Sequence, residues 1–237
     1  GLTTPNIPGW EPEANRPGLK WEDPVVTAAR LVPVLRGPER CDVVVALIHS
    51  GLEADPASGE PEGRALGNRV VALAREVPGI DLILTGHTHR RIPLSRVHGV
   101  PFLQPGRWGE VLARVDLVVE TSKKRSRIVE IRSELLPSDS SVVIDPEIAA
   151  IAAPHHERAL AYLDEPLATA GGPFPASRAR LEDTALLDLV NETQRAVTGA
   201  DLSLTSLLPF RYDGWEAGPL TVRHVYSLYP YENQLVV

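Results

Sequence analysis

Methionine is absent from this sequence, and cysteine occurs only once, at position 41. A single cysteine excludes an internal disulfide, and its place at the start of an apolar run indicates a packed thiol rather than a reactive one. No apolar run approaches the ~20 residues that a membrane-spanning helix requires, and no signal peptide is recognisable. Because residue 1 is not methionine, we expect a piece of a longer protein, so the missing targeting segment says nothing about its compartment.

Two catalytic sequence motifs are also missing. The Gly-x-Ser-x-Gly motif of many serine hydrolases does not occur, which leaves little support for His49 and Ser50 as a nucleophilic pair. A P-loop does not occur either, so its backbone cradle for phosphate is excluded. The formal net charge of −7 argues against a protein that binds nucleic acid polymers, but it is compatible with a small anionic substrate.

Two short apolar runs, at residues 42–48 and 81–85, have the composition of buried strands. Between them, residues 64–77 place apolar side chains at helical spacing, and Pro78-Gly79 ends the pattern. A strand, a helix and a second strand with short connections predict a right-handed βαβ unit with parallel strands. The expected fold class is therefore α/β.

Each of these two predicted strands is followed by histidine. His49 follows the first strand, and His87 and His89 follow the second in the sequence Gly86-His87-Thr88-His89. The carboxyl ends of parallel strands meet at one edge of a sheet, so the three imidazoles are expected to lie close together, where they can bind metal. Side chains at i and i+2 of an extended segment alternate in direction, so they can serve two ions about 3.5–4 Å apart, as in two-metal hydrolases. The alternative is that they are ordinary polar residues at strand ends.

The remaining segments outline the rest of the fold. Asp23 and Asp145 each precede a proline, which is typical of helix N-caps. Helices are predicted at residues 25–35, 146–163, 183–198 and 221–228, and strands at 92–97, 100–104, 111–120, 127–135 and 202–205. The histidines at positions 98, 155, 156 and 224 lack the context of a strand end and are interpreted as structural.

Residues 44–51 and 81–89 resemble the last two metal motifs of the calcineurin-like metallophosphoesterases, and the single predicted helix between them fits the spacing of that family. Further segments resemble its 5′-nucleotidase branch, including the C-terminal substrate domain of that branch: residues 2–5, 104–109, 183–190, 218–221 and 229–233. Residues 208–211 and 229–237 favour the 2′,3′-cyclic-nucleotide 2′-phosphodiesterase/3′-nucleotidase group. The resemblance covers nearly the whole chain.

The resemblance implies an α/β fold of the α+β sandwich type. Residues 1–140 would form the C-terminal half of a metallophosphoesterase domain with layered strands and helices. Residues 141–165 would form a connector helix, and residues 166–237 the N-terminal part of an α/β substrate-binding domain of the 5′-nucleotidase type.

The same resemblance implies two divalent metal ions, such as Mn, Zn or Fe. His49 and His87 match ligands of the second ion, and His89 matches a ligand of the first. The family's other ligands and its catalytic histidine belong to Asp-x-His, Gly-Asp and Gly-Asn-His motifs, which this chain does not contain. Asn68 follows Gly67 but lies within the predicted helix, so it does not replace them. We therefore expect no catalytic residue in this chain and no turnover by the chain alone.

For the full-length parent, the resemblance implies two-metal hydrolysis of nucleotide phosphoesters, as a 2′,3′-cyclic-nucleotide phosphodiesterase or a 3′- or 5′-nucleotidase of nucleotide catabolism. The partner would be a nucleotide or cyclic nucleotide, with no nucleic acid polymer and no membrane span, in the periplasm or outside the cell. Phe210 and Arg211 are candidate substrate contacts, against the alternative that Arg211 is a surface charge. The alternative function is a non-catalytic fragment or a metal-binding module without turnover.

Overall fold

The computed structural model of the chain describes residues 1–55, 58, 60–61, 67–121, 126–205, 213–230 and 235. The chain forms two compact units, Gly1–Val143 and Ile144–Val237. Both units combine helices with strands, as expected for the α/β class. The finer division expected from the sequence, at residues 140 and 165, stays a prediction.

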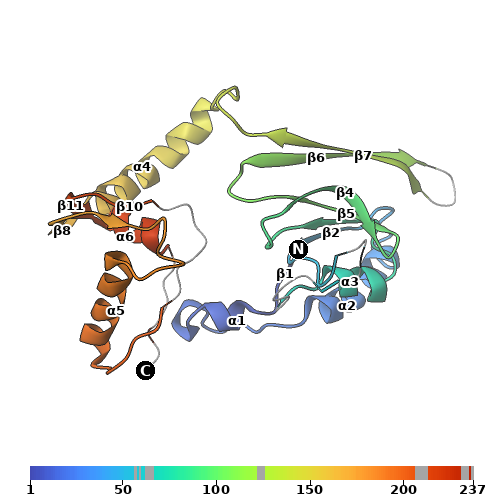
Figure 1. Ribbon diagram of the computed structural model, residues 1–237. Coiled ribbons are helices and arrows are strands. Elements are labelled where there is room, and N and C mark those ends of the chain that lie inside the picture. The colour runs from blue at the N-terminus through green and yellow to red at the C-terminus, as the bar shows by residue number, and fades with distance from the viewer. Residues whose placement is uncertain are drawn as a thin grey trace. The chain divides into compact units, whose positions relative to one another are not determined.

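A five-stranded sheet with the strand order β1-β2-β3-β5-β4 forms the centre of the first unit (Figure 1). Its strands are β1 (Leu2–Thr3), β2 (Val45–His49), β3 (Leu82–Thr85), β4 (Arg91–Val97) and β5 (Val100–Pro105). Neighbouring strands are parallel except β4 and β5, which form an antiparallel hairpin. The parallel pairing of β2 with β3 agrees with the βαβ unit predicted from the two apolar runs.

Two helices cover one face of this sheet, and a second hairpin lies on its other side (Figure 1). The helices are α2 (Pro24–Arg36) and α3 (Val70–Glu76), and the hairpin consists of β6 (Val111–Glu120) and β7 (Arg127–Pro137). The short α1 (Ile7–Trp10) and a 3₁₀ helix (Glu13–Asn15) connect β1 to α2. The four strands expected between residues 92 and 135 are therefore all present.

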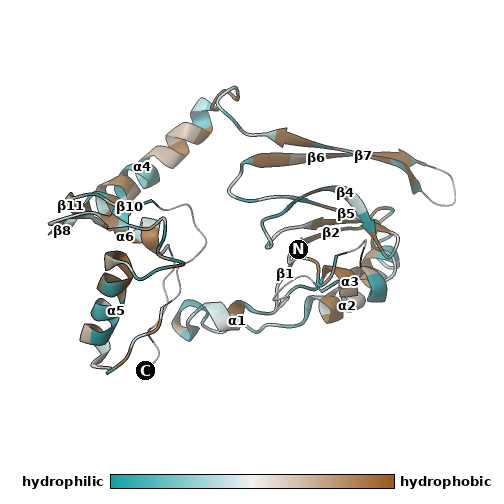
Figure 2. Cartoon of the chain, viewed as in Figure 1, coloured by the Kyte–Doolittle hydropathy of each residue, from teal (hydrophilic) through white to brown (hydrophobic). Residues whose placement is uncertain are grey.

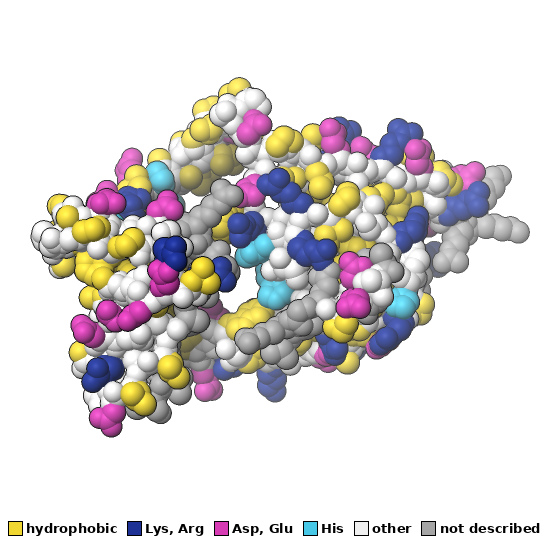
Figure 3. Space-filling model, in the orientation of Figure 1, with side chains coloured by type: hydrophobic (Ala, Val, Ile, Leu, Met, Phe, Trp, Pro, Cys, Tyr) yellow, Lys and Arg dark blue, Asp and Glu magenta, His cyan; other side chains and the backbone are white. Residues whose placement is uncertain are grey.

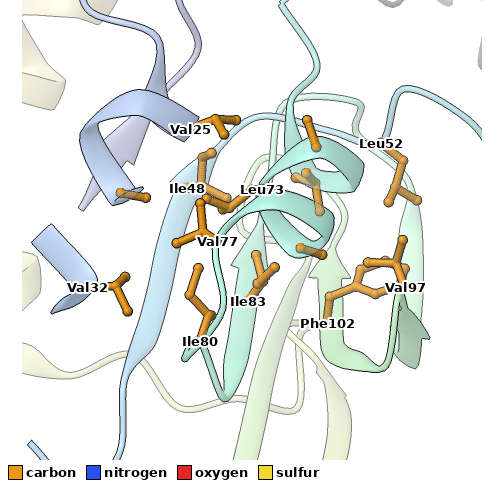
Figure 4. Close-up of a cluster of buried hydrophobic side chains, with 14 of the residues drawn as sticks. Val25, Val32, Ile48, Leu52, Leu73, Val77, Ile80, Ile83, Val97 and Phe102 are labelled. Atoms are coloured by element: carbon orange, nitrogen blue, oxygen red, sulfur yellow. The ribbon is translucent and has the colours of Figure 1, made fainter. Parts of the chain in front are cut away.

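The hydrophobic core lies between the sheet and the helices α2 and α3 (Figure 4). Ile48, Ile83 and Phe102 point into it from three neighbouring strands, Leu73 reaches it from α3, and Val77 reaches it from directly after this helix. Figure 2 shows the apolar residues of these strands and of α3. Full burial of one such side chain stabilises a fold by about 1.5–3 kcal/mol, so the carboxyl ends of β2 and β3 rest on a packed support.

Helix α3 begins later than expected. It starts at Val70, whereas the sequence pattern predicted a start near residue 64. Gly67 has a φ of +88°, which is a left-handed conformation, and the side chain of Asn68 is hydrogen-bonded to the loop after β2. These contacts hold residues 67–69 outside the helix.

Strand β2 is more exposed than a strand buried on both faces. The side chains of Val45 and Leu47 are 42% and 62% exposed, because the described elements cover mainly the opposite face, to which Ile48 belongs. Helix α2 continues to Arg36, one residue beyond the predicted end, with Pro33 inside the helix.

The second unit begins with α4 (Pro146–Leu163), which Asp145 caps as predicted. Its other elements are β8 (Pro166–Ala170), β9 (Phe174–Pro175), α5 (Ala185–Thr198), β10 (Gly214–Trp215), β11 (Gly218–Thr221) and α6 (Val222–Leu228). The strand expected at residues 202–205 does not form, whereas β8 pairs with β11 in a segment for which no strand was predicted. No helix within the described ranges is both long and apolar enough to cross a membrane.

Asp23 joins the start of α2 to the start of α3. Its carboxylate accepts hydrogen bonds from the Val25 amide and from Nε of Arg69, both at 2.8 Å. Burial raises the pKa of this carboxyl, but the hydrogen bonds from Arg69 and Val25 together outweigh burial, so the pKa lies below its usual value. A carboxyl whose pKa is lowered by folding stabilises the fold above its unfolded-state pKa, and this stabilisation is lost as the pH falls through the folded-state pKa.

The substitution Asp23→Asn keeps a capping side chain but removes the charge. We expect it to lower the free energy of unfolding by about 1 kcal/mol at pH 7, because the ion pair with Arg69 is partly exposed. The loss should shrink as the pH falls below about 4. Urea unfolding at pH 3 and pH 7 measures it, with Glu39→Gln, at an exposed position of the same unit, as control. The same loss at both pH values would contradict this role of Asp23.

Candidate metal centre

The three predicted histidine ligands lie at the carboxyl ends of β2 and β3. The strand register places Ile48 opposite Thr85, so His49 lies next to the turn that follows β3. The imidazole rings of His49 and His87 have their centroids 5.2 Å apart, with 62° between the ring planes. Histidine side chains are visible at the molecular surface in Figure 3. Two segments far apart in sequence therefore bring two imidazoles side by side.

The indole ring of Trp10 is a further member of this cluster. It stacks on His87 with ring centroids 5.2 Å apart and 27° between the planes. Trp10 ends α1, which follows β1, and the chain between them is tied to the site because the Thr4 amide donates to the His49 carbonyl at 2.9 Å. The sequence did not assign Trp10 to the site, because its segment, rich in proline and glycine, has no strand or helix pattern that would place the side chain.

The turn that carries His87 and His89 is left-handed rather than extended. Their φ angles are +77° and +59°, a conformation that costs a non-glycine residue roughly 1–2 kcal/mol. The Thr88 amide donates to the Gly86 carbonyl at 3.0 Å within this turn. The expectation that the two histidines alternate in direction along extended chain is therefore wrong, and their assignment to different ions stays a prediction.

Buried polar side chains hold the loop after β2. Asn68 accepts a hydrogen bond from the Gly51 amide at 3.1 Å and donates to the Leu52 carbonyl at 2.9 Å. Ser50 is fully buried and donates to the Gly67 carbonyl at 2.8 Å. The loop that begins at His49 is thus fixed to the chain just before α3, which gives Asn68 a structural role.

A second buried amide, Gln104 on β5, holds the turn after β3. Its Nε2 donates to the Thr88 hydroxyl at 2.9 Å and to the Arg90 carbonyl at 2.8 Å, and its Oε1 accepts from the Thr85 hydroxyl at 3.2 Å. Sequence reasoning did not assign a role to Gln104. The available signal was a single amide directly after the apolar run of residues 100–103.

Burial and nearby charge favour the neutral form of His87. The half-buried position of His87 lowers its pKa, and the positive charges that His49 and His89 can carry lower it further. A metal ligand must be a neutral imidazole, so this environment favours the binding-competent state. His49 and His89 thus both lie within electrostatic reach of His87.

The donors present fit part of a metal site. Between described residues, no hydrogen bond engages the ring nitrogens of His49, His87 or His89. Within the same residues, no group of three or more His, Cys, Asp or Glu side chains is arranged to hold a metal ion. A transition metal takes about four to six donors, so the pair His49 and His87 needs further ligands from other residues.

Two other histidines have contacts within or at the start of helices, and the two substrate candidates lie outside the described residues. Nδ1 of His224 accepts from the Thr221 amide at 2.9 Å and caps α6, which agrees with its structural interpretation. His155 contacts Arg158 on α4 at 2.9 Å. Phe210 and Arg211 lie outside the described residues, so their role stays a prediction.

Gly51 is the point where the two histidine-bearing loops meet. A Cβ at this position would lie 2.2 Å from Cγ2 of Thr88 and 2.9 Å from Oδ1 of Asn68, and both side chains are held by hydrogen bonds. Gly51→Ala is therefore expected to lower the free energy of unfolding by about 1–3 kcal/mol, measured by thermal or urea unfolding. Gly171→Ala, which meets no atom within 4 Å, is the control. Equal stability of the two variants would contradict this close approach.

The lowered pKa of His87 can be measured directly in the metal-free chain. Proton NMR titration of the imidazole signals should give His87 a pKa below the usual 6.5. His49→Ala removes one neighbouring charge, so it should raise this pKa toward the usual value, while burial keeps it below 6.5. An unchanged His87 titration in His49→Ala would show that the two rings do not interact.

Comparison with known proteins finds similarity to nucleotidases along the whole chain. Residues 162–237 match the family of 5′-nucleotidase C-terminal domains. The whole chain aligns at 28% identity with the 2′,3′-cyclic-nucleotide 2′-phosphodiesterase/3′-nucleotidase of Salmonella typhimurium, covering 42% of that protein. It also aligns at 23% identity with the trifunctional nucleotide phosphoesterase protein YfkN of Bacillus subtilis, covering 18% of it. The chain thus spans less than half the length of these curated relatives.

A solved structure from Staphylococcus aureus, assigned as a 5′-nucleotidase and bound to alpha-ketoglutarate, has the same fold. It superimposes with a TM-score of 0.77 at 26% identity, covering 98% of this chain and 44% of the other. The superposition confirms the α/β fold class, and the sequence matches confirm the resemblance to the nucleotidase family. The chain is homologous to the 2′,3′-cyclic-nucleotide 2′-phosphodiesterase/3′-nucleotidases, and its residues 162–237 match the 5′-nucleotidase C-terminal domain family.

Proposed function

We propose that this chain supplies part of the two-metal centre of a hydrolase that cleaves nucleotide phosphoesters. The substrate class is 2′,3′-cyclic nucleotides together with 3′- or 5′-nucleotides. The observation that carries the proposal is the pair of adjacent imidazoles, His49 and His87, at the ends of two parallel strands. The printed names of the relatives in Salmonella typhimurium and Bacillus subtilis support the substrate class.

The histidines hold the metal ions in this proposal. His49 and His87 bind one divalent ion, and His89 binds the second. When bound, such ions activate water and stabilise charge on the phosphoryl oxygens. The chain itself keeps His87 neutral by burial and holds the ring beside His49 and Trp10. Mn, Zn and Fe all accept sites that mix imidazole with carboxylate ligands.

The remaining parts of the active site come from sequence that this chain does not contain. In the resembled family, Asp-x-His, Gly-Asp and Gly-Asn-His motifs supply the other ligands and the catalytic histidine. We therefore propose that the chain alone binds metal without turning over substrate. Phe210 and Arg211 contact the substrate, and the full-length protein acts in the periplasm or outside the cell.

Metal binding by the 237-residue chain tests the first part of the proposal. Equilibrium dialysis against Mn²⁺ should detect binding that His87→Ala weakens by at least about 10-fold, because a ligand is lost. His156→Ala, an exposed histidine on α4, is the matched control and should bind as the wild type does. Equal affinity of His87→Ala and the wild type would exclude His87 as a ligand.

Hydrolysis is tested with the full-length product of the gene that encodes this chain. It should cleave 2′,3′-cyclic AMP in the presence of Mn²⁺, and His87→Ala should lower kcat by about 10–100-fold or more. The 237-residue chain alone should show no turnover. Turnover by the chain alone that disappears in His87→Ala would overturn the need for further motifs. An inactive, folded full-length protein would overturn the hydrolase assignment.

A further inference from the structure

The side-chain amide of Gln104 is hydrogen-bonded to the end of β3 and to the turn that carries two of the proposed ligands. The side chain is 0% exposed, and both hydrogens of its Nε2 are used, one by the Thr88 hydroxyl and one by the Arg90 carbonyl. Its Oε1 accepts from the Thr85 hydroxyl at 3.2 Å and from the Thr88 hydroxyl at 3.0 Å. The amide therefore has no polar capacity left for a substrate or metal.

The turn it holds is one that does not form easily by itself. His87 and His89 both adopt left-handed backbone conformations, which non-glycine residues rarely do without support from their surroundings. Gln104 is hydrogen-bonded to Thr88, which lies between these two histidines, and to Arg90, which directly follows them. These two anchor points fix the segment from which both imidazoles project.

We propose that Gln104 is a positioning residue, whose amide holds the turn of residues 86–90 in the conformation that sets the imidazoles of His87 and His89 at the metal site. This inference rests on the proposed metal-binding function. The competing explanation is a buried amide that stabilises the fold generally. The hydroxyls of Thr85 and Thr88 both bond to Gln104, but Thr85 belongs to β3 whereas Thr88 belongs to the turn. A positioning role predicts that metal affinity depends on the Thr88 hydroxyl and not on the Thr85 hydroxyl. A general stabiliser predicts no such difference.

The matched substitutions are Thr88→Val and Thr85→Val. Each keeps the shape of the side chain and removes a hydroxyl bonded to Gln104, and Thr88→Val also keeps the methyl group that lies near Gly51. Thr88→Val and Gln104→Met should each raise the dissociation constant for Mn²⁺ by about 10–100-fold, which is the usual cost of removing a residue that orients metal ligands. Thr85→Val should leave it within about twofold although the melting temperature falls, because the turn keeps its anchors at Thr88 and Arg90. Thr88→Ser, which restores the hydroxyl, should restore the affinity.

A second measurement does not depend on metal. In the metal-free chain, NMR should detect cross-relaxation between the rings of His49 and His87 and between those of Trp10 and His87, whose centroids are each 5.2 Å apart. These contacts should persist in Thr85→Val and weaken in Thr88→Val and Gln104→Met, with the amide spectrum showing that the fold is retained.

The outcomes separate this inference from the proposed function. If the wild-type chain binds no Mn²⁺ but the ring contacts respond as expected, the metal site is overturned and the positioning role of Gln104 stands. If the ring contacts and the Mn²⁺ affinity are the same in Thr88→Val, Thr85→Val and the wild type, Gln104 is a general stabiliser and the inference is overturned. Should Gln104→Met fail to fold, the comparison of the two threonine variants still decides between these results.

Discussion

Parallel pairing of β2 with β3 is the constraint on which the candidate centre depends. The register runs from Val45 opposite Leu82 to Ile48 opposite Thr85, so both strands reach the same edge of the sheet together. A shift of one residue would turn the buried face of each strand outward, so packing of the core against α2 and α3 fixes the register. The distance between the rings of His49 and His87 follows from this packing.

Hydrogen bonds orient the loops that apolar packing does not orient. Burial of apolar surface is non-directional and supports the strands but does not orient the loops that leave them. Asn68 and Gln104 each bind one of these loops through a buried amide with defined geometry. Gly51 allows the two loops to touch, since any Cβ there would collide with Thr88. The centre is therefore a polar layer placed on top of a hydrophobic core.

The two units contribute different kinds of information about function. The first unit contains the histidine cluster, whose proposed metal-binding role is inferred from geometry and charge. Most of the second unit, residues 162–237, matches the 5′-nucleotidase C-terminal domain family, so its proposed role is inferred from sequence similarity. The first kind indicates metal binding and the second indicates similarity to nucleotidases, and the proposed activity combines the two.

The sequence by itself determined the strands and their histidines. Short apolar runs followed by histidine predict strands that end at a candidate site. Asp23 and Asp145 mark the starts of two helices, because a cap depends only on local hydrogen bonds. Tertiary structure decided the left-handed turn at His87 and the late start of α3. It also decided the exposed face of β2 and the pairing of β8 with β11. The physical reason is the range of the interactions: a cap joins neighbours, whereas Gln104 meets Thr88 and Asn68 meets Gly51 across 16 and 17 residues of chain, where a local pattern carries no signal.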